Sequence, residues 1–378
     1  MRTAVFALVA ALSAAPAYAQ FGDVLNKIQK AKDKVDELNI DDREERQLGE
    51  TVSANLREKY GVVQSEELTK YVTLVGTALA QASTRPNLNW RFIVLDTDGV
   101  NAFAAPGGIV HVTRGLLGLV RNEAELAGAL GHEITHITVK HTVRAIEKSK
   151  TIQMASDEAG SGTARDRFVA ALAQEAYNRI LNNEFSREDE SEADRVGVQL
   201  ASRLGYAPHG LVNVLRKLDA RNSGRDERNG LFASHPATKE RIDRLEKQIK
   251  DEKLTGNAII EARYTEHVHF EAKPLGDIAV GADGAAGLAG GSNATKDAKD
   301  TQESKDSQQQ AEGKKKGSLL SKFTTSSSGE KQSTQTIASA GARGIGPDRD
   351  AKGGPNKNIV VVTVTATELA AFKKGITA

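Results

Sequence analysis

The stretch Leu130-Gly131-His132-Glu133-Ile134-Thr135-His136 decides the fold and the chemistry expected of this chain. Ahead of it, Asn122 and Glu125 form the Asn-x-x-Glu pattern that is typical of a helix N-terminus. Apolar residues then recur at helical spacing, namely Leu126, Ala129, Leu130, Ile134 and Ile137. The stretch is therefore predicted to lie on a helix.

The two histidines of this stretch are four residues apart, which places both imidazoles on one face of the predicted helix. Two imidazoles in that relation can bind one Zn²⁺, each at roughly 2.0–2.1 Å. Glu133 lies beside them and can take a proton from a water on the metal. The same pattern also suits a helix whose histidines are core or surface residues, so a third ligand has to decide between the two interpretations.

A second acidic segment, residues 186–194, offers that third ligand. Ser186 is predicted to start a helix, on which Glu190 and Asp194 share a face. A catalytic zinc requires three protein ligands, and a ligand imidazole usually donates its other N–H to a carboxylate or a carbonyl. Spacing alone does not choose Glu190 over Glu188 or Glu192. An acidic run of this kind is also typical of a solvated helix face.

Composition narrows the classes of protein that the chain can be. The 378 residues include no Cys, which excludes a disulfide scaffold, a thiolate zinc knuckle, a cysteine nucleophile and a lipidated cysteine anchor. The formal net charge of +1 argues against nucleic-acid binding driven by counterion release. No stretch of 18 or more apolar residues follows the first twenty, so no later segment is expected to span a bilayer.

The first residues are predicted to be a signal peptide. Residues 1–19 contain Arg2, an apolar run over 4–12 and an Ala-x-Ala site that ends at Ala19. The apolar run is too short for a membrane anchor. The mature chain, starting at Gln20, is therefore expected to be secreted across the inner membrane and to be periplasmic in a Gram-negative source.

Hydrophobic periodicity divides the chain into helical and extended parts. Strands are predicted over 91–95 and 109–113, the second after the turn residues Pro106-Gly107-Gly108. Helices are predicted over 21–38, 43–60, 65–82 and most of 122–250. The predicted fold class is α+β, mainly helical, with a small β-sheet beside the helix of His132 and His136.

The composition changes after residue 256. Residues 256–280 are predicted to be a β-rich extension, because 258–272 alternate weakly between apolar and polar side chains. Residues 281–357 are rich in Gly, Ser, Lys, Asp and Gln and are predicted to be a disordered linker. Residues 358–378 are predicted to be a short tail, β-rich over 359–365 and helical over 368–374.

Residues 41 to about 250 resemble the zinc peptidases of family M48, which include the CAAX prenyl proteases, the HtpX heat-shock protease and soluble periplasmic proteases of outer-membrane protein quality control. The motifs that carry the resemblance stand in the family's order. They are Asn101–Gly108, Thr113–Leu117, Asn122–Ala127, Gly131–His136, Glu190–Asp194 and Ser234–Ile242. The resemblance implies a gluzincin-type zinc metalloprotease domain over residues 20–255 and a metalloendopeptidase as the enzyme class.

The resemblance also completes the metal site. In the family, the Glu four residues before an Asp binds the metal, which implies Glu190 as the third ligand beside His132 and His136. Asp194 is then the carboxylate that accepts the other N–H of a ligand imidazole. One Zn²⁺ per chain is expected, with a coordination position left for water.

Two further segments acquire roles through the resemblance. His235 and Arg241 match positions near the zinc that stabilise the oxyanion, and His235 can also occupy the open metal position in a latent state. From the residues alone, His235-Pro236 indicates only the start of a helix. The strand Asn101-Ala102-Phe103-Ala104 matches the one beside the active-site helix, and an exposed edge there is expected to hold an extended peptide substrate.

The sequence therefore predicts a zinc-dependent endopeptidase with Glu133 as general base, hydrolysing envelope proteins in periplasmic or outer-membrane protein quality control. The expected partners are protein or peptide substrates, without nucleic acid, and outer-membrane assembly machinery by peripheral association. The alternative is a latent or chaperone-like assembly factor whose zinc site is kept closed by His235. No transmembrane segment is expected, unlike in the membrane-embedded relatives, which argues against prenylated substrates.

Two other histidines are expected to take no part in the metal site. His141 follows His136 by five residues, about 140° around a continuous helix, so it is not expected to bind the same metal. His111 lies on a predicted strand and is expected to be a packed or surface residue.

Overall fold

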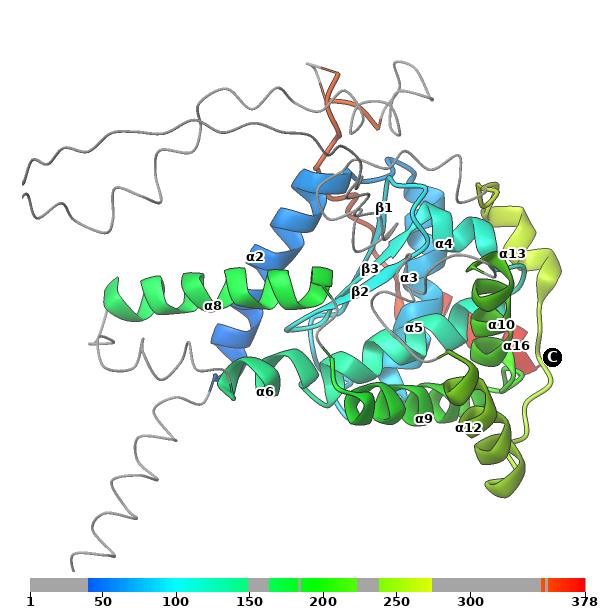
Figure 1. Ribbon diagram of the computed structural model, residues 1–378. Helices are drawn as coiled ribbons and strands as arrows, with labels where there is room; N and C mark the ends of the chain where they lie inside the picture. Colours follow the sequence, from blue (N-terminus) through cyan, green and yellow to red (C-terminus); the bar gives the residue numbers. More distant parts are fainter. Residues whose placement is uncertain are drawn as a thin grey trace, which may run out of the picture.

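The computed structural model describes residues 40–148, 163–182, 185–222, 238–273, 348–350 and 353–377. Helices dominate this part of the chain (Figure 1). They are α2 (Asp42–Tyr60), α3 (Glu66–Gln81), α4 (Arg114–Leu119), α5 (Glu123–Thr138), α6 (His141–Glu147), α8 (Thr163–Asn182), α9 (Arg187–Arg203), α10 (Gly210–Asn222), α12 (Thr238–Asp251), α13 (Glu261–His267) and α16 (Ala366–Thr377). Together with a small sheet, they confirm the predicted mainly helical α+β class.

The sheet has three strands, β1 (Arg91–Leu95), β2 (Ala102–Ala105) and β3 (Ile109–Thr113), in the order β1-β3-β2. β1 runs parallel to β3, whereas β2 runs antiparallel to β3 with Ala102 opposite Val112. The φ angles of Gly107 and Gly108 are 75° and 104°, a conformation that favours glycine, in the turn between β2 and β3. Both predicted strands and the predicted turn are confirmed.

Helix α5 lies at the centre of the core, and every one of its residues is buried. The sheet lies on one side of α5, and α9 and α10 lie on another (Figure 1). Asn122 begins the helix as predicted, because its side-chain oxygen accepts the N–H of Glu125 at 3.0 Å. Polar side chains on a fully buried helix need partners inside the protein, so any chemistry of His132 and His136 takes place in the interior.

Two glycines set the distance between α5 and α9. A Cβ on Gly197 of α9 would lie 2.7 Å from the backbone nitrogen of His132, and one on Gly131 of α5 would lie 2.8 Å from the carbonyl oxygen of Gly197. Such distances are shorter than real Cβ contacts, so only glycine allows these two backbones to approach so closely. The crossing therefore fixes the separation of the helices that carry His132 and Glu190.

The segment after the main helices differs from its prediction. Residues 261–267, expected to be extended, form helix α13, so the β-rich interpretation of this segment is wrong. Tyr264 of α13 is buried, and its hydroxyl donates to the carbonyl oxygen of Leu117. A weak alternation of apolar and polar side chains favours a strand only slightly, and the burial of Tyr264 outweighs it.

The described C-terminal residues pack on the main domain. Helix α16 packs on α3 through its buried residues Leu369, Phe372 and Ile376. Lys70 of α3 pairs with Glu368 at 2.6 Å. The helical turn predicted over 368–374 is confirmed as part of α16, whereas residues 359–365, predicted to be β-rich, form no strand in the structure.

Arg263 links α13 and α16 to the start of α5. Its guanidinium carbon lies 4.1 Å from the ring centroid of Phe372, and it forms an ion pair with the buried Glu123, the first residue of α5. Glu123 also accepts the hydroxyl protons of Tyr71 at 3.2 Å and Tyr206 at 2.9 Å. The C-terminal pieces therefore belong to the domain that carries the predicted active-site helix.

The end of the predicted linker also contacts this domain. The backbone N–H of Gln64 donates to Oδ1 of Asp348 at 2.6 Å, and that of Val62 donates to the carbonyl oxygen of Asn356 at 2.7 Å. These two bonds place Asp348 and Asn356, which lie within the predicted linker, against the domain. The rest of the linker, the signal peptide and the helix predicted over 21–38 lie outside the described residues. Among the described helices, none has the length and hydropathy of a membrane span.

Candidate active site

Three predicted ligands converge inside the domain. One ligand atom from each of His132, His136 and Glu190 lies within 4.8 Å of the other two. The Nε2 atoms of His132 and His136 are 3.1 Å apart, and the two Glu190 carboxylate oxygens lie 3.6 and 3.4 Å from them. All three side chains are at most 4% exposed. Two imidazoles and one carboxylate are the donor set of one class of catalytic zinc site, so the residues present suit this metal.

The start of α9 directs Glu190 towards α5. Ser186 begins this helix as predicted: its hydroxyl accepts the N–H of Asp189 at 3.1 Å, and the Asp189 carboxylate accepts the N–H of Ser186 at 3.2 Å. Spacing could not choose among three acids of this helix. Glu188 is exposed, and the carboxylate of Glu192 lies beside a different histidine, His141. Glu190 is therefore the one of the three that faces His132 and His136.

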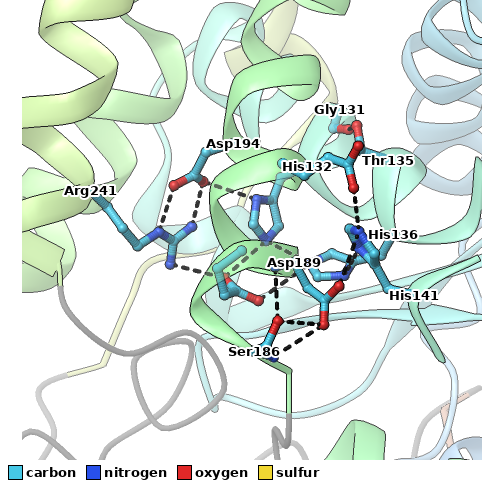
Figure 2. A network of polar contacts seen from close by, with 11 residues as sticks. Gly131, His132, Thr135, His136, His141, Ser186, Asp189, Asp194 and Arg241 are labelled. Atoms are coloured by element: carbon cyan, nitrogen blue, oxygen red, sulfur yellow. Dashed lines mark hydrogen bonds and ion pairs between the residues drawn. The ribbon is translucent and has the colours of Figure 1, made fainter. Parts of the chain in front are cut away.

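Behind His132, a buried ion pair fixes the ring. Nδ1 of His132 lies 3.1 Å from Oδ1 of Asp194, whose carboxylate accepts Nε and Nη2 of Arg241 at 2.8 and 2.6 Å (Figure 2). Burial alone would raise the pKa of Asp194, but the guanidinium and the bond from His132 outweigh it and hold that pKa at about 2. Asp194 is therefore ionised at neutral pH, which keeps the proton of His132 on Nδ1 and leaves Nε2 for a metal.

Glu133 lies on the same buried helix, next to His132, and is 3% exposed. Burial raises the pKa of its carboxyl to about 7, and the negative charge of Glu190 adds to this effect, while the charges of His136 and Arg241 oppose it. A carboxylate with a pKa near neutrality is well suited to take up and release a proton at neutral pH.

Two predicted site elements are placed differently from expectation. The guanidinium of Arg241 contacts Asp194 and also lies 3.4 Å from Glu190. These contacts favour a role in holding the two carboxylates in place, and not the predicted role in stabilising an oxyanion. β2 is an edge strand, as the substrate-binding prediction requires, but Asn101, Ala102, Phe103 and Ala104 are at most 4% exposed. The predicted exposed edge is therefore covered. His235 lies outside the described residues.

One residue beside the cluster was missed by the sequence analysis. Nδ1 of His141 lies 2.9 Å from Nδ1 of His136, and the two ring centroids are 4.8 Å apart. On a continuous helix, His141 would point away from His136. The structure breaks the helix at Lys140, and the only local signal in the sequence is a third histidine soon after the pair.

Comparison with known proteins identifies the family. The sequence model of Peptidase family M48 matches residues 66–249. Metalloprotease YcaL of Escherichia coli (strain K12) is 31% identical over 188 residues, which are 49% of this chain and 72% of YcaL. The chain belongs to peptidase family M48. This membership confirms the predicted resemblance and the predicted enzyme class, a metalloendopeptidase.

Other M48 relatives cover different shares of the chain. The beta-barrel assembly-enhancing protease of Escherichia coli (strain K12) is 29% identical over 254 residues, 62% of this chain and 50% of the relative. Metalloprotease LoiP of the same strain is 27% identical over 188 residues, 48% of this chain and 70% of LoiP. This M48 chain therefore spans about half the length of the beta-barrel assembly-enhancing proteases that it matches.

Proposed function

We propose that this M48 chain is a zinc-dependent endopeptidase that cleaves envelope proteins in the periplasm, in outer-membrane protein quality control. The observation that carries the proposal is the buried cluster of His132, His136 and Glu190, with Glu133 beside it. The predicted signal peptide and the relatives named beta-barrel assembly-enhancing protease support the location and the substrate class. Association with outer-membrane assembly machinery is part of the same proposal.

In the proposed mechanism, His132, His136 and Glu190 hold the zinc ion. Zinc in such a site acts as a Lewis acid towards the scissile carbonyl and makes water acidic near neutral pH. Glu133 takes a proton from the attacking water on its carboxylate and passes it to the nitrogen of the leaving amine. Its position on α5 beside His132, inside the buried site, suits both transfers, because the carboxylate can accept the proton and the acid can give it up again.

The residues behind the ligands keep the rings in place. Asp194 accepts the Nδ1 proton of His132, and Arg241 holds Asp194 and lies beside Glu190. This arrangement orients one imidazole and balances two buried negative charges. A role of His235 in stabilising the oxyanion stays a prediction, as does binding of an extended substrate along β2.

The covered edge of β2 favours a second candidate, a resting state that is latent. A substrate strand cannot pair with residues that are at most 4% exposed until the covering segments move. His235 is the predicted residue that keeps the zinc site closed. If the protein is latent because His235 closes the zinc site, His235→Ala raises peptidase activity, whereas in a ready enzyme it lowers activity or leaves it unchanged.

The replacement Glu133→Gln tests the proposed function. The purified mature chain is assayed for zinc content and for cleavage of an unfolded outer-membrane protein, with Glu188→Gln as the matched control because Glu188 is an exposed acid on α9. We expect Glu133→Gln to keep one zinc per chain and to lose activity by about 10²–10⁴-fold, as removal of a general base does. Full activity in this variant, or zinc retained at wild-type affinity in Glu190→Gln, would reject the assignment.

A further inference from the structure

The proton positions on two neighbouring histidines follow from their contacts. Nε2 of His136 lies 3.1 Å from Nε2 of His132 and 3.4 Å from Glu190, so this nitrogen faces the proposed metal. A neutral imidazole that binds a metal through Nε2 carries its proton on Nδ1. Nδ1 of His136 lies 2.9 Å from Nδ1 of His141. His136 must therefore donate this hydrogen bond and His141 must accept it.

The other nitrogen of His141 faces acids of α9. Because Nδ1 accepts, Nε2 carries the proton of the neutral ring. This nitrogen lies 3.2 Å from Oε2 of Glu192 and 3.5 Å from Oδ1 of Asp189. Figure 2 shows His141 and Asp189 close to His136. A continuous series of contacts thus leads from the metal-facing imidazole to the helix that carries Glu190.

A break in the main chain places His141 at this position. Helix α5 ends at Thr138, and Lys140 adopts φ 60° and ψ 37°, the left-handed conformation that is uncommon outside glycine. Helix α6 begins at His141 immediately afterwards. Ion pairs from Nζ of Lys140 to Asp42 at 3.1 Å and to Glu45 at 2.9 Å hold the turn. The break turns His141 back under His136, which a continuous helix could not do.

The environment of His141 restricts the ring further. Its side chain is fully buried, and it packs edge-on against the ring of His136 at an interplanar angle of 73°. The ring of Phe185 lies 4.3 Å from that of His136 and 6.5 Å from that of His141, measured between centroids. The two imidazoles therefore have little freedom to rotate away from their shared hydrogen bond.

We propose that His141 is a positioning residue for the metal ligand His136. It accepts the Nδ1 proton of His136 and thereby fixes both the tautomer and the orientation in which Nε2 meets the metal. Asp194 does the same for His132, but with a carboxylate in place of an imidazole. Glu192 and Asp189 in turn fix the tautomer of His141. The inference rests on the proposed metal site, and it assigns a role in metal binding to a residue outside the ligand set.

Two amide replacements of His141, each of which can mimic one of the ring nitrogens, separate the positioning role from a role in packing. The amide of Asn in His141→Asn can place its oxygen near the position of Nδ1 and keep the acceptor. The amide of Gln in His141→Gln lies near the position of Nε2 and leaves Nδ1 of His136 without that acceptor. Zinc affinity of the mature chain is measured by competition with a chromogenic chelator, and the Co²⁺ derivative is examined by absorption spectroscopy. The exposed His209→Gln is the control.

We expect His141→Gln to weaken zinc binding by about 10–100-fold, the usual effect of losing such a partner, and to alter the Co²⁺ spectrum. His141→Asn should stay within about threefold of wild type, with an unaltered spectrum. Equal losses in both variants, or wild-type affinity in His141→Gln, would overturn the proposal. Urea unfolding checks that each variant is folded.

If His141→Gln does not fold, Glu192→Ala perturbs the same contacts from a side chain that is 38% exposed. It should weaken zinc binding by several-fold, and an unchanged affinity would overturn the proposal. Failure of the proposed function gives a different result. In that case His132→Ala and Glu190→Gln also leave zinc affinity unchanged, whereas failure of the positioning role alone leaves those two variants without zinc.

Discussion

Arg241→Met removes the cation that faces two buried carboxylates. The side chains of Arg241, Asp194 and Glu190 are 2%, 5% and 3% exposed, so solvent screens their interaction weakly. Breaking a buried ion pair by removing one partner costs about 3–5 kcal/mol, because the other charge is left without compensation. We therefore expect Arg241→Met to lower the free energy of unfolding of the zinc-free mature chain by about 3–5 kcal/mol.

A double-mutant cycle with Asp194→Asn tests the cause of this loss. The amide that this replacement introduces does not carry the charge that Arg241 balances, so the double variant should lose about 1–3 kcal/mol less than the sum of the single variants. The free energies come from urea unfolding at neutral pH in the presence of a chelator. Arg244→Met is the matched control, because Arg244 lies on the same helix, is 39% exposed and pairs with Glu240 at i,i+4. Its loss should be below about 1 kcal/mol.

Zinc provides a further check on the same reasoning. The metal supplies positive charge to Glu190, so zinc should recover part of the stability that Arg241→Met loses. Single losses that add to within about 0.5 kcal/mol would refute the coupling of Arg241 to Asp194. A loss in Arg241→Met no larger than in Arg244→Met would refute the assigned magnitude.

Three further predictions concern residues that pack the domain around and beyond the site. Gly197→Ala should destabilise the protein by about 1–3 kcal/mol and weaken zinc binding, because the new Cβ meets the backbone of His132. Calorimetry measures the stability and chelator competition measures the zinc affinity. An unchanged affinity would contradict the role of the close crossing of α5 and α9. Burial lowers the pKa of His111 from 6.5 to about 3. As the pH falls, the imidazole of His111 is protonated in the unfolded chain before it is protonated in the folded one. The free energy of unfolding therefore decreases between pH 6.5 and 3 by about 1.4 kcal/mol per pH unit. His111→Gln should remove this part of the pH dependence in urea unfolding, and an unaltered pH dependence would count against the prediction. Phe372→Ala should lower stability by about 3 kcal/mol in one cooperative transition, whereas a separate early transition would show that α16 is not part of the domain.

Local patterns in the sequence predicted the parts of the site that depend on spacing. The interval between His132 and His136 and the caps at Asn122 and Ser186 are short-range properties, and the structure has them as expected. The choice of Glu190 among three acids needed the family resemblance. Spacing alone could not make it, because which acid faces α5 depends on how two helices cross.

The features that sequence reasoning missed depend on tertiary contacts. The left-handed Lys140 that brings His141 under His136 is held by Asp42 and Glu45, which are distant in sequence. Residues 261–267 are helical because Tyr264 is buried against the domain. Neither contact has a local signature, so periodicity predicted a continuous helix in the first case and a strand in the second.

The C-terminal residues pack back on the domain, so the domain can stay assembled even when the backbone is cut. The described residues on both sides of the interval 274–347 belong to one domain: Val62 and Gln64 donate backbone N–H groups to Asn356 and Asp348, and α16 packs on α3. A protease cut within this interval would therefore give a two-chain molecule in which the C-terminal fragment stays bound. Such a nicked form would run as two bands under denaturing conditions and as one species in native separation.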